Sequence, residues 1–181
     1  MNELCQKSAT SLAKLIRDRD VSSKEVVEAH LNRISEVNAV INAITIPLYE
    51  SALKECKLAD NAPSEKRSRV FHGVPFTVKE NIDLLGTPTT QGLPVHANSM
   101  PSKSAPVVNR MIGAGAIPIG RTNMPEAGVR MDTDNPLRGR TLNPWNSGLV
   151  TGGSSGGEAA ALATGMSPFG LGNDIDRKSV V

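Results

Sequence analysis

The sequence predicts an α/β fold in which helices cover a mixed central sheet. Apolar residues recur at helical spacing through the first third of the chain. Short apolar runs with β-branched residues begin only after Val70 and then alternate with helical stretches. This change of pattern divides the chain into an N-terminal helical segment (1–69), an α/β core (70–175) and a tail (176–181).

Residues 1–60 have the pattern of helices. Ser22 and Glu25 form an S-x-x-E capping box, which predicts the start of a second helix. A third helix is expected at about 48–58, and the polar stretch 60–69, which contains Pro63, is expected to be a surface loop. The apolar residues on the inner faces of the first two helices are Leu12, Leu15, Ile16, Val26, Val27, Leu31 and Ile34.

Two apolar runs in the second part of the chain are predicted to be strands of one sheet, at 73–79 and 116–120. A short helix is expected between them at 105–112. A helix of small residues is expected over 157–165, starting at a glycine–serine loop, and 169–173 is expected to begin another strand or a turn.

The composition argues against several classes of function. Lys and Arg number 20 and Asp and Glu number 18, so the net charge of +2 gives no electrostatic argument for a nucleic-acid or membrane partner. Aromatic residues make up 3% of the chain, too few for a base-stacking surface. No secretory signal is evident at the start, and no apolar run approaches the roughly 20 residues of a membrane span. Cys5 and Cys56 lack a CxxC motif and a histidine cluster, so we expect a cytoplasmic protein with reduced thiols and without a bound metal.

Lys79 is the first candidate for chemistry. It ends the apolar strand predicted at 73–79, where desolvation would disfavour the charged amine and lower the pKa of this side chain. A neutral amine near the working pH is a competent general base. The structural alternative is a lysine that reaches solvent from the end of a strand.

The second candidate is the stretch TGGSSGGEAA, at 151–160. Gly152, Gly153, Gly156 and Gly157 permit backbone conformations that other residues disfavour, so the loop can turn several N–H groups toward an anion. A phosphate loop would need a lysine, which is absent, and the Glu158 carboxylate would repel phosphate. Adjacent serine hydroxyls favour hydroxyl chemistry, and a flexible turn is the structural alternative.

Three stretches of the sequence closely resemble the amidase-signature family. They are GVPFTVKENIDLLGTPTTQG (73–92), GAIPIGRTNMPE (115–126) and TGGSSGGEAAALATGMSPFGLGNDI (151–175). The resemblance covers nearly the whole chain. It implies an amidase-signature fold and hydrolysis of carboxamides by a Ser–Ser–Lys triad, without a cofactor or a metal.

The resemblance assigns roles by position. Lys79 matches the basic lysine and Ser154 the bridging serine, whose preceding peptide bond is cis in the family. The nucleophilic serine is expected at position 178, and the oxyanion hole in the region of Asp174 and Ile175 and the glycines that follow. The sequence departs from the pattern there, because Lys178 stands at the serine position.

The residues before Lys178 depart from the pattern as well. Asp176 and Arg177 replace the two glycines. DRKSVV (176–181) is also the translation of a common sequencing-adapter string, so we expect a non-native or frameshifted tail. The resemblance thus implies that 70–175 is the N-terminal part of an amidase core, incomplete in this chain and inactive as written.

The predicted function is hydrolysis of a carboxamide to a carboxylate and ammonia or an amine. Two alternatives stay open: the amidase subunit of a tRNA-dependent amidotransferase, and a non-catalytic fragment or binding module. The expected partner is a small-molecule amide, with no nucleic acid and no membrane, and a homo-oligomer is left open.

Overall fold

The computed structural model describes residues 1–174, and its centre is one four-stranded sheet in the order β1-β3-β2-β4. The strands are β1 (Ile44–Pro47), β2 (Pro75–Lys79), β3 (Ile117–Thr122) and β4 (Gly170–Leu171). β1 pairs with β3 in antiparallel orientation, whereas β2 is parallel to both β3 and β4. The predicted mixed sheet is therefore confirmed, and the strands predicted at 73–79 and 116–120 are neighbours in it.

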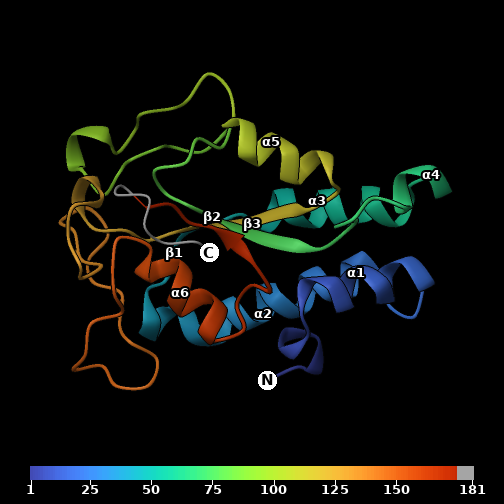
Figure 1. Ribbon diagram of the computed structural model, residues 1–181, viewed down its shortest axis with the longest axis horizontal. Coiled ribbons are helices and arrows are strands. Elements are labelled where there is room, and N and C mark those ends of the chain that lie inside the picture. Colours follow the sequence, from blue (N-terminus) through green and yellow to red (C-terminus); the bar gives the residue numbers. More distant parts are fainter. Residues whose placement is uncertain (175–181) are drawn as a thin grey trace.

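Six α-helices accompany the sheet in the described part of the chain: α1 (Ala9–Asp18), α2 (Ser23–Ile41), α3 (Tyr49–Asp60), α4 (Ser64–Arg67), α5 (Pro106–Gly113) and α6 (Gly156–Ala163). Short 3₁₀ turns lie at Glu3–Gln6, Pro94–His96 and Glu126–Gly128. Figure 1 shows α1, α2 and α6 on one side of the sheet and α5 on the other. This arrangement confirms the α/β class, with helices covering both faces.

The local sequence explains where the main helices begin. The Ser22 side chain accepts a hydrogen bond from the backbone N–H of Glu25, and the Glu25 carboxylate accepts one from the backbone N–H of Ser22, so the predicted capping box is confirmed. Ser8 caps α1 in the same way by accepting from the N–H of Ser11. Pro106 starts α5 at a position where the missing N–H costs nothing.

Two expectations about the N-terminal segment are wrong. Residues 44–47 form β1, although residues 1–60 have a helical pattern, because pairing with β3 decides the conformation of this four-residue run. The predicted loop at 60–69 contains the single helical turn α4, which follows Pro63 and consists mostly of good helix formers. The sheet therefore includes a strand from the predicted helical segment.

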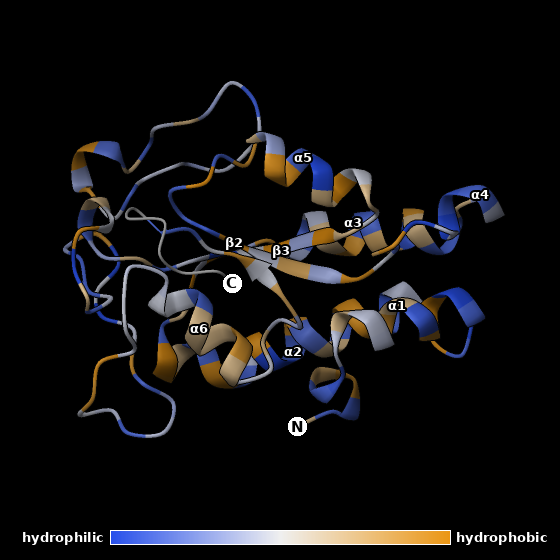
Figure 2. Ribbon diagram, in the orientation of Figure 1, coloured by the Kyte–Doolittle hydropathy of each residue, from blue (hydrophilic) through white to orange (hydrophobic). Residues whose placement is uncertain are grey.

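Apolar side chains fill both sides of the sheet. Figure 2 shows hydrophobic and hydrophilic residues alternating along α1, α2 and α5, as expected for helices that bury one face. The side that faces α2 and α6 contains a cluster that includes Val27, Leu31, Ile34, Ile117, Ile119, Ala160 and Met166. The opposite side packs Phe76 and Val78 of β2 against Val108 of α5.

Phe169 stacks on both other phenylalanines of the chain, Phe71 and Phe76, and these contacts anchor the segment that leads into β4. The ring centroids of Phe71 and Phe169 are 4.9 Å apart, and those of Phe76 and Phe169 are 5.6 Å apart. Offset stacking at these distances adds to the area that the rings bury. Phe169 thereby brings 170–174 alongside the end of β2, which forms the candidate site.

Cys5 and Cys56 are buried and form no disulfide. In residues 1–174, no helix combines the length and apolarity that crossing a membrane requires.

Candidate active site

Lys79, the last residue of β2, is fully buried and points toward the serine loop. Successive strand residues face opposite sides of a sheet, so Lys79 lies on the side away from Val78. Its Nζ donates hydrogen bonds to Ser154 Oγ at 2.7 Å and to Ser155 Oγ at 2.9 Å. The two residues that the resemblance matches to the basic lysine and the bridging serine are therefore in direct contact, and the alternative of a solvent-reaching lysine is wrong.

Asn173 completes the surroundings of the Lys79 amine. Lys79 Nζ donates to Asn173 Oδ1 at 2.8 Å, and Asn81 Nδ2 donates to the same oxygen at 3.2 Å. Ser155 Oγ donates to the Asn173 carbonyl oxygen at 3.2 Å. Asn81 and Asn173 are not among the site residues predicted from the sequence, although both lie within stretches that resemble the family. The amine is therefore held by oxygens from two segments that are distant in the sequence.

Burial lowers the pKa of Lys79 from 10.5 to about 8, as predicted in direction. The negative charges of Asp174 and Glu158 oppose this shift and keep the pKa from falling further. An amine with this pKa is partly unprotonated near neutral pH, while its conjugate acid remains a good proton donor. Lys79 thus meets both the geometric and the acid–base requirements of a general base.

Glu158 is bonded to the sheet, although the sequence motif indicated only a carboxylate at the serine loop that would repel phosphate. Its side chain is buried, and Glu158 Oε2 accepts a hydrogen bond from Thr122 Oγ1 at 2.8 Å, while Oε1 accepts one from Thr77 Oγ1. Burial raises the pKa of Glu158 from 4.5 to about 7, against the lowering effect of the two hydroxyl donors and of Lys79. The carboxylate is therefore bound to the sheet beneath the serine loop.

The glycines of the serine loop serve close packing more than unusual backbone conformation. Of the four, only Gly152 has a positive φ, +84°. A Cβ on Gly156 would lie 2.3 Å from Thr133 Oγ1, and a Cβ on Gly157 would lie 2.4 Å from the Asn123 backbone. The peptide bond between Gly153 and Ser154 is cis, as the resemblance implies. Packing of helix α6 against its neighbours therefore fixes the two serines.

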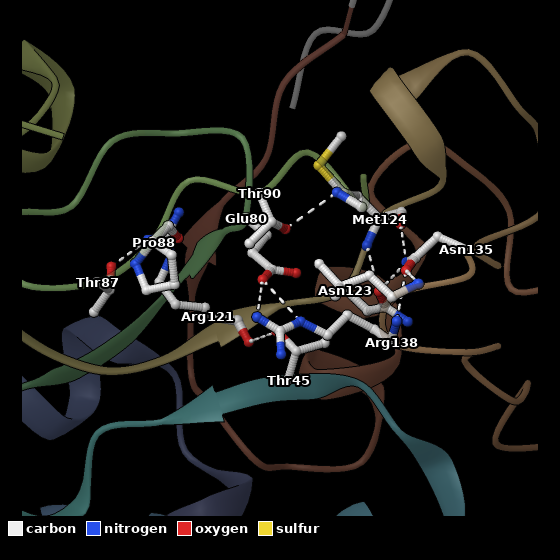
Figure 3. Close-up of polar contacts among 12 residues, drawn as sticks. Thr45, Glu80, Thr87, Pro88, Thr90, Arg121, Asn123, Met124, Asn135 and Arg138 are labelled. Atoms are coloured by element: carbon white, nitrogen blue, oxygen red, sulfur yellow. Dashed lines mark hydrogen bonds and ion pairs between the residues drawn. The ribbon is translucent and has the colours of Figure 1, made fainter. Parts of the chain in front are cut away.

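The buried Thr133 side chain stabilises the serine loop through two hydrogen bonds. Its Oγ1 donates to the Gly152 carbonyl oxygen at 2.9 Å and accepts from the Gly156 N–H at 3.1 Å. The loop that contains Thr133 is fixed in turn by an ion pair between Arg138 and the buried Glu80 at 2.7 Å (Figure 3). One polar network thus joins the residue after Lys79 to the loop that holds Ser154.

Asn123 and Asn135 form the centre of that network (Figure 3). Asn135 Nδ2 donates to Asn123 Oδ1 at 2.8 Å and to the Met124 carbonyl oxygen at 2.7 Å. Asn135 Oδ1 accepts from the backbone N–H of Arg138 at 2.7 Å. Buried amides with several partners specify one arrangement of the loop.

Arg121 of β3 fixes the segment that follows Lys79. Its guanidinium is fully buried and donates to the carbonyl oxygens of Val78, Lys79, Ile82 and Pro88 and to the Thr87 hydroxyl. Burial lowers the pKa of Arg121 to about 10, so the group stays charged at neutral pH. Figure 3 shows Arg121 directed toward Thr87 and Pro88.

A pocket of about 470 Å³ opens beside the two serines. Its lining residues include Ser154, Ser155, Glu158, Leu162, Asn173 and Asp174. The volume is in the range of small-molecule sites. The pocket therefore places a space for a small ligand against the hydroxyl groups that contact Lys79.

Comparison with known proteins agrees with this geometry. The sequence profile of the Amidase family matches residues 25–177. The chain belongs to the amidase-signature family. It is 44% identical over 171 residues to the indoleacetamide hydrolase of Bradyrhizobium diazoefficiens and 41% identical over 176 residues to human fatty-acid amide hydrolase 2, covering 94% and 93% of this chain. Each match covers 33% of the relative, so the chain spans about a third of the length of these curated relatives.

Structural comparison supports the same membership in the amidase-signature family. A solved fatty acid amide hydrolase superimposes with a TM-score of 0.89 at 30% identity, covering 96% of this chain and 31% of that one. A glutamyl-tRNA(Gln) amidotransferase subunit of Dehalococcoides mccartyi is a further relative, 36% identical over 174 residues, which are 96% of this chain and 36% of that one. The family therefore includes both hydrolases and an amidotransferase subunit.

The described residues bring most of the predicted amidase-signature site together. Lys79, Ser154 and the four glycines meet at one end of β2, and Asp174 lies close enough to Lys79 to influence its pKa. Ile175 and position 178 lie outside the described residues. Within residues 1–174, no three His, Cys, Asp or Glu side chains gather where they could hold a metal ion.

Proposed function

We propose that this chain supplies the base and the bridging serine of an enzyme that hydrolyses linear carboxamides to a carboxylate and ammonia or an amine. The observation that supports this most directly is the 2.7 Å contact between Lys79 Nζ and Ser154 Oγ beside the 470 Å³ pocket. A lysine of lowered pKa and a hydroxyl at hydrogen-bond distance are the parts that proton transfer needs.

In the proposed mechanism, the free amine of Lys79 accepts the proton of Ser154 Oγ. Ser154 in turn accepts the proton of a nucleophilic serine, whose oxygen bonds to the amide carbonyl carbon. The C–N bond of the tetrahedral intermediate breaks as the nitrogen takes a proton back through Ser154. Water then attacks the acyl-enzyme ester, releasing the carboxylate and restoring the serine.

The chain as written lacks the residues that the mechanism needs at its nucleophile. Lys178 stands where the serine is expected, and Asp176 and Arg177 stand where glycines are expected. We propose that the backbone around Asp174 and Ile175 belongs to the oxyanion hole. One oxyanion-hole donor is worth ~3–4 kcal/mol of transition-state stabilisation, so loss of the following glycines adds to the loss of the serine. The 181-residue chain should therefore hydrolyse no amide through a serine triad.

A chimera tests the proposed machinery. Residues 1–175 would be joined to Gly-Gly-Ser and the remaining C-terminal part of the Bradyrhizobium indoleacetamide hydrolase, and ammonia release from simple amides and indoleacetamide would be measured. Lys79→Ala and Ser154→Ala should each lower kcat by ~10²–10⁴-fold, the usual contribution of a positioned proton-transfer group. The exposed Lys103→Ala is the matched control and should keep the activity.

The pH dependence of the chimera provides a second readout. Only the unprotonated Lys79 can act as the base, so kcat/KM, which reports the free enzyme, should rise with pH and reach half its plateau near the pKa of about 8. A chimera that is active but indifferent to Lys79→Ala would refute the assignment of the base. Turnover by the unmodified 181-residue chain would refute the assignment of the nucleophile.

The amidotransferase alternative differs in what receives the ammonia. A relative of that class is 36% identical to this chain, so the same experiment should decide between the two. Release of free ammonia by the chimera without any partner subunit supports the hydrolase. Activity that requires partner subunits and tRNA would support the amidotransferase. A chimera that folds but transforms no amide would leave the binding-module alternative.

We propose a small-molecule amide as the partner, and neither nucleic acid nor a membrane, because the net charge is +2 and aromatic residues are few. A cytoplasmic location is proposed on the composition and on the two unpaired cysteines. A homo-oligomer is a further proposal, which sedimentation of the chain would test.

A further inference from the structure

Glu158 takes no part in the proposed mechanism, yet its carboxylate lies beneath the base. We propose that Glu158 is a positioning residue for Lys79, whose buried carboxylate stabilises the lysine ammonium and thereby sets how readily this amine takes the proton of Ser154. The proposal rests on the proposed function only for the role of Lys79 as a base. The coupling between the two side chains is a property of the folded chain and needs no substrate.

The strand register places the Glu158 carboxylate beside Lys79. Thr122, which donates to Glu158 Oε2, is the register partner of Lys79 in the parallel pairing of β2 with β3. Thr77, which donates to Oε1, precedes Lys79 by two residues and so faces the same side of the sheet. The two hydroxyls that hold the carboxylate thus flank the strand position of the lysine.

β4 encloses the carboxylate from the third side. A Cβ on Gly170 would lie 1.9 Å from Glu158 Oε1, so only glycine lets the β4 backbone approach this closely. The register pairs Gly170 with Thr77. The carboxylate is therefore surrounded by three neighbouring strands and by its own helix, α6. This enclosure fixes its position relative to Lys79.

The charges around Lys79 and Glu158 explain how the carboxylate acts on the lysine amine. In the described residues, Lys79 is the cation that acts on Glu158, and the anions that act on Lys79 are Asp174 and Glu158. The buried cation of β3, Arg121, bonds to the segment after Lys79 instead. A buried carboxylate is costly unless its charge is compensated. Protonation of Lys79 supplies that compensation, so Glu158 favours the step in which the lysine takes a proton.

Asp174 acts on Lys79 with the same sign, so the experiment must separate the two carboxyl groups. The 181-residue chain would be labelled with ¹³C and ¹⁵N in lysine, and the Lys79 Nζ resonance would be followed against pH. The resonance is assigned by its loss in Lys79→Met. The variants are Glu158→Gln, Asp174→Asn and, as a matched control, the exposed Glu55→Gln.

Glu158→Gln should lower the titration midpoint of Lys79 by about one pH unit, a tenfold loss of proton affinity. Glu55→Gln should leave the midpoint unchanged, and Asp174→Asn should lower it independently of Glu158. Glu158→Asp, which keeps the charge, should restore at least half of the shift. A Glu158→Gln midpoint within about 0.2 units of the unsubstituted chain would overturn the proposal.

A measurement on the unsubstituted chain tests the coupling of Glu158 and Lys79 even if the variants misfold. With ¹³C-labelled glutamate as well, the carboxyl carbon of Glu158 should titrate, and Lys79 Nζ should show an inflection at the same pH. Independent titration of the two groups would overturn the proposal even without a variant.

Activity of the chimera separates this inference from the proposed function. Glu158→Gln should move the acidic limb of its kcat profile to lower pH, whereas a merely structural role would lower kcat at every pH without moving the limb. Absence of any amidase activity with a shifted Lys79 midpoint would refute the function and keep the inference. Normal activity with an unmoved limb and midpoint would refute the inference alone.

Discussion

Replacing Arg121 by methionine tests whether the segment after the candidate base is held by one buried guanidinium. The change keeps an unbranched apolar stem of similar reach but removes every donor. Four backbone carbonyl oxygens and the Thr87 hydroxyl lose a hydrogen bond at once. Because these acceptors stay in place, the substitution differs from exchanging a whole buried ion pair for apolar residues, which is often neutral.

The structure gives the magnitude. The Lys79 carbonyl oxygen also accepts from the Ile82 N–H, so it keeps a partner. In residues 1–174, no other backbone donor reaches the carbonyl oxygens of Ile82 and Pro88. A buried acceptor left without a partner costs ~1–3 kcal/mol, so the buried Ile82 carbonyl predicts a loss of ~1–3 kcal/mol in the free energy of unfolding, to which the partly buried Pro88 carbonyl adds less. Arg121→Lys, which keeps the charge but not the fork of donors, should lose less.

Urea unfolding followed by circular dichroism measures this loss by linear extrapolation. The matched control is Arg110→Met on the exposed face of α5, where the loss should stay within ~0.5 kcal/mol. A loss below ~1 kcal/mol for Arg121→Met would show that water or backbone movement replaces the guanidinium, and that the reasoning about the unpaired carbonyls is wrong.

Three further predictions concern the serine loop and its supports. Gly157→Ala should lower the free energy of unfolding by ~1–3 kcal/mol through overpacking. Gly113→Ala, with open space around the new methyl group, should raise it by up to ~1 kcal/mol. Thermal melting of both variants measures the difference. Arg138→Met should lower the free energy of unfolding by ~3–5 kcal/mol because the buried Glu80 loses its ion pair. A Glu80→Gln, Arg138→Met double variant should recover part of this loss. An equal loss in the single and the double variant would contradict the ion-pair argument. Because burial raises the folded-state pKa of Glu158 from 4.5 to about 7, its contribution to stability is complete below pH 4.5 and is lost as the pH rises through about 7. Unfolding free energies across this window should therefore fall with pH, and the fall should be smaller in Glu158→Gln.

Several elements could be predicted because their signals are local. The capping box at Ser22 and Glu25 lies within four consecutive residues, and the apolar spacing of α1 and α2 lies within single helices. β1 could not be predicted in this way, because a four-residue run takes its conformation from pairing with β3 at 117–122. The glycines of the serine loop were predicted for a different physical reason than the one found at Gly156 and Gly157, where neighbouring segments leave no room for a Cβ.

The sequence by itself determined the α/β class through its apolar patterns and the family through its long motifs, and the resemblance to that family assigned Lys79 and Ser154 to one site. Only the tertiary structure decided what surrounds them. Asn173 reaches the Lys79 amine, and Glu158 turns to Thr77 and Thr122, because strands distant in the chain become neighbours in the sheet. The pKa values of Lys79 and Glu158 depend on burial and on charges that different segments contribute, so no local pattern in the sequence contains them.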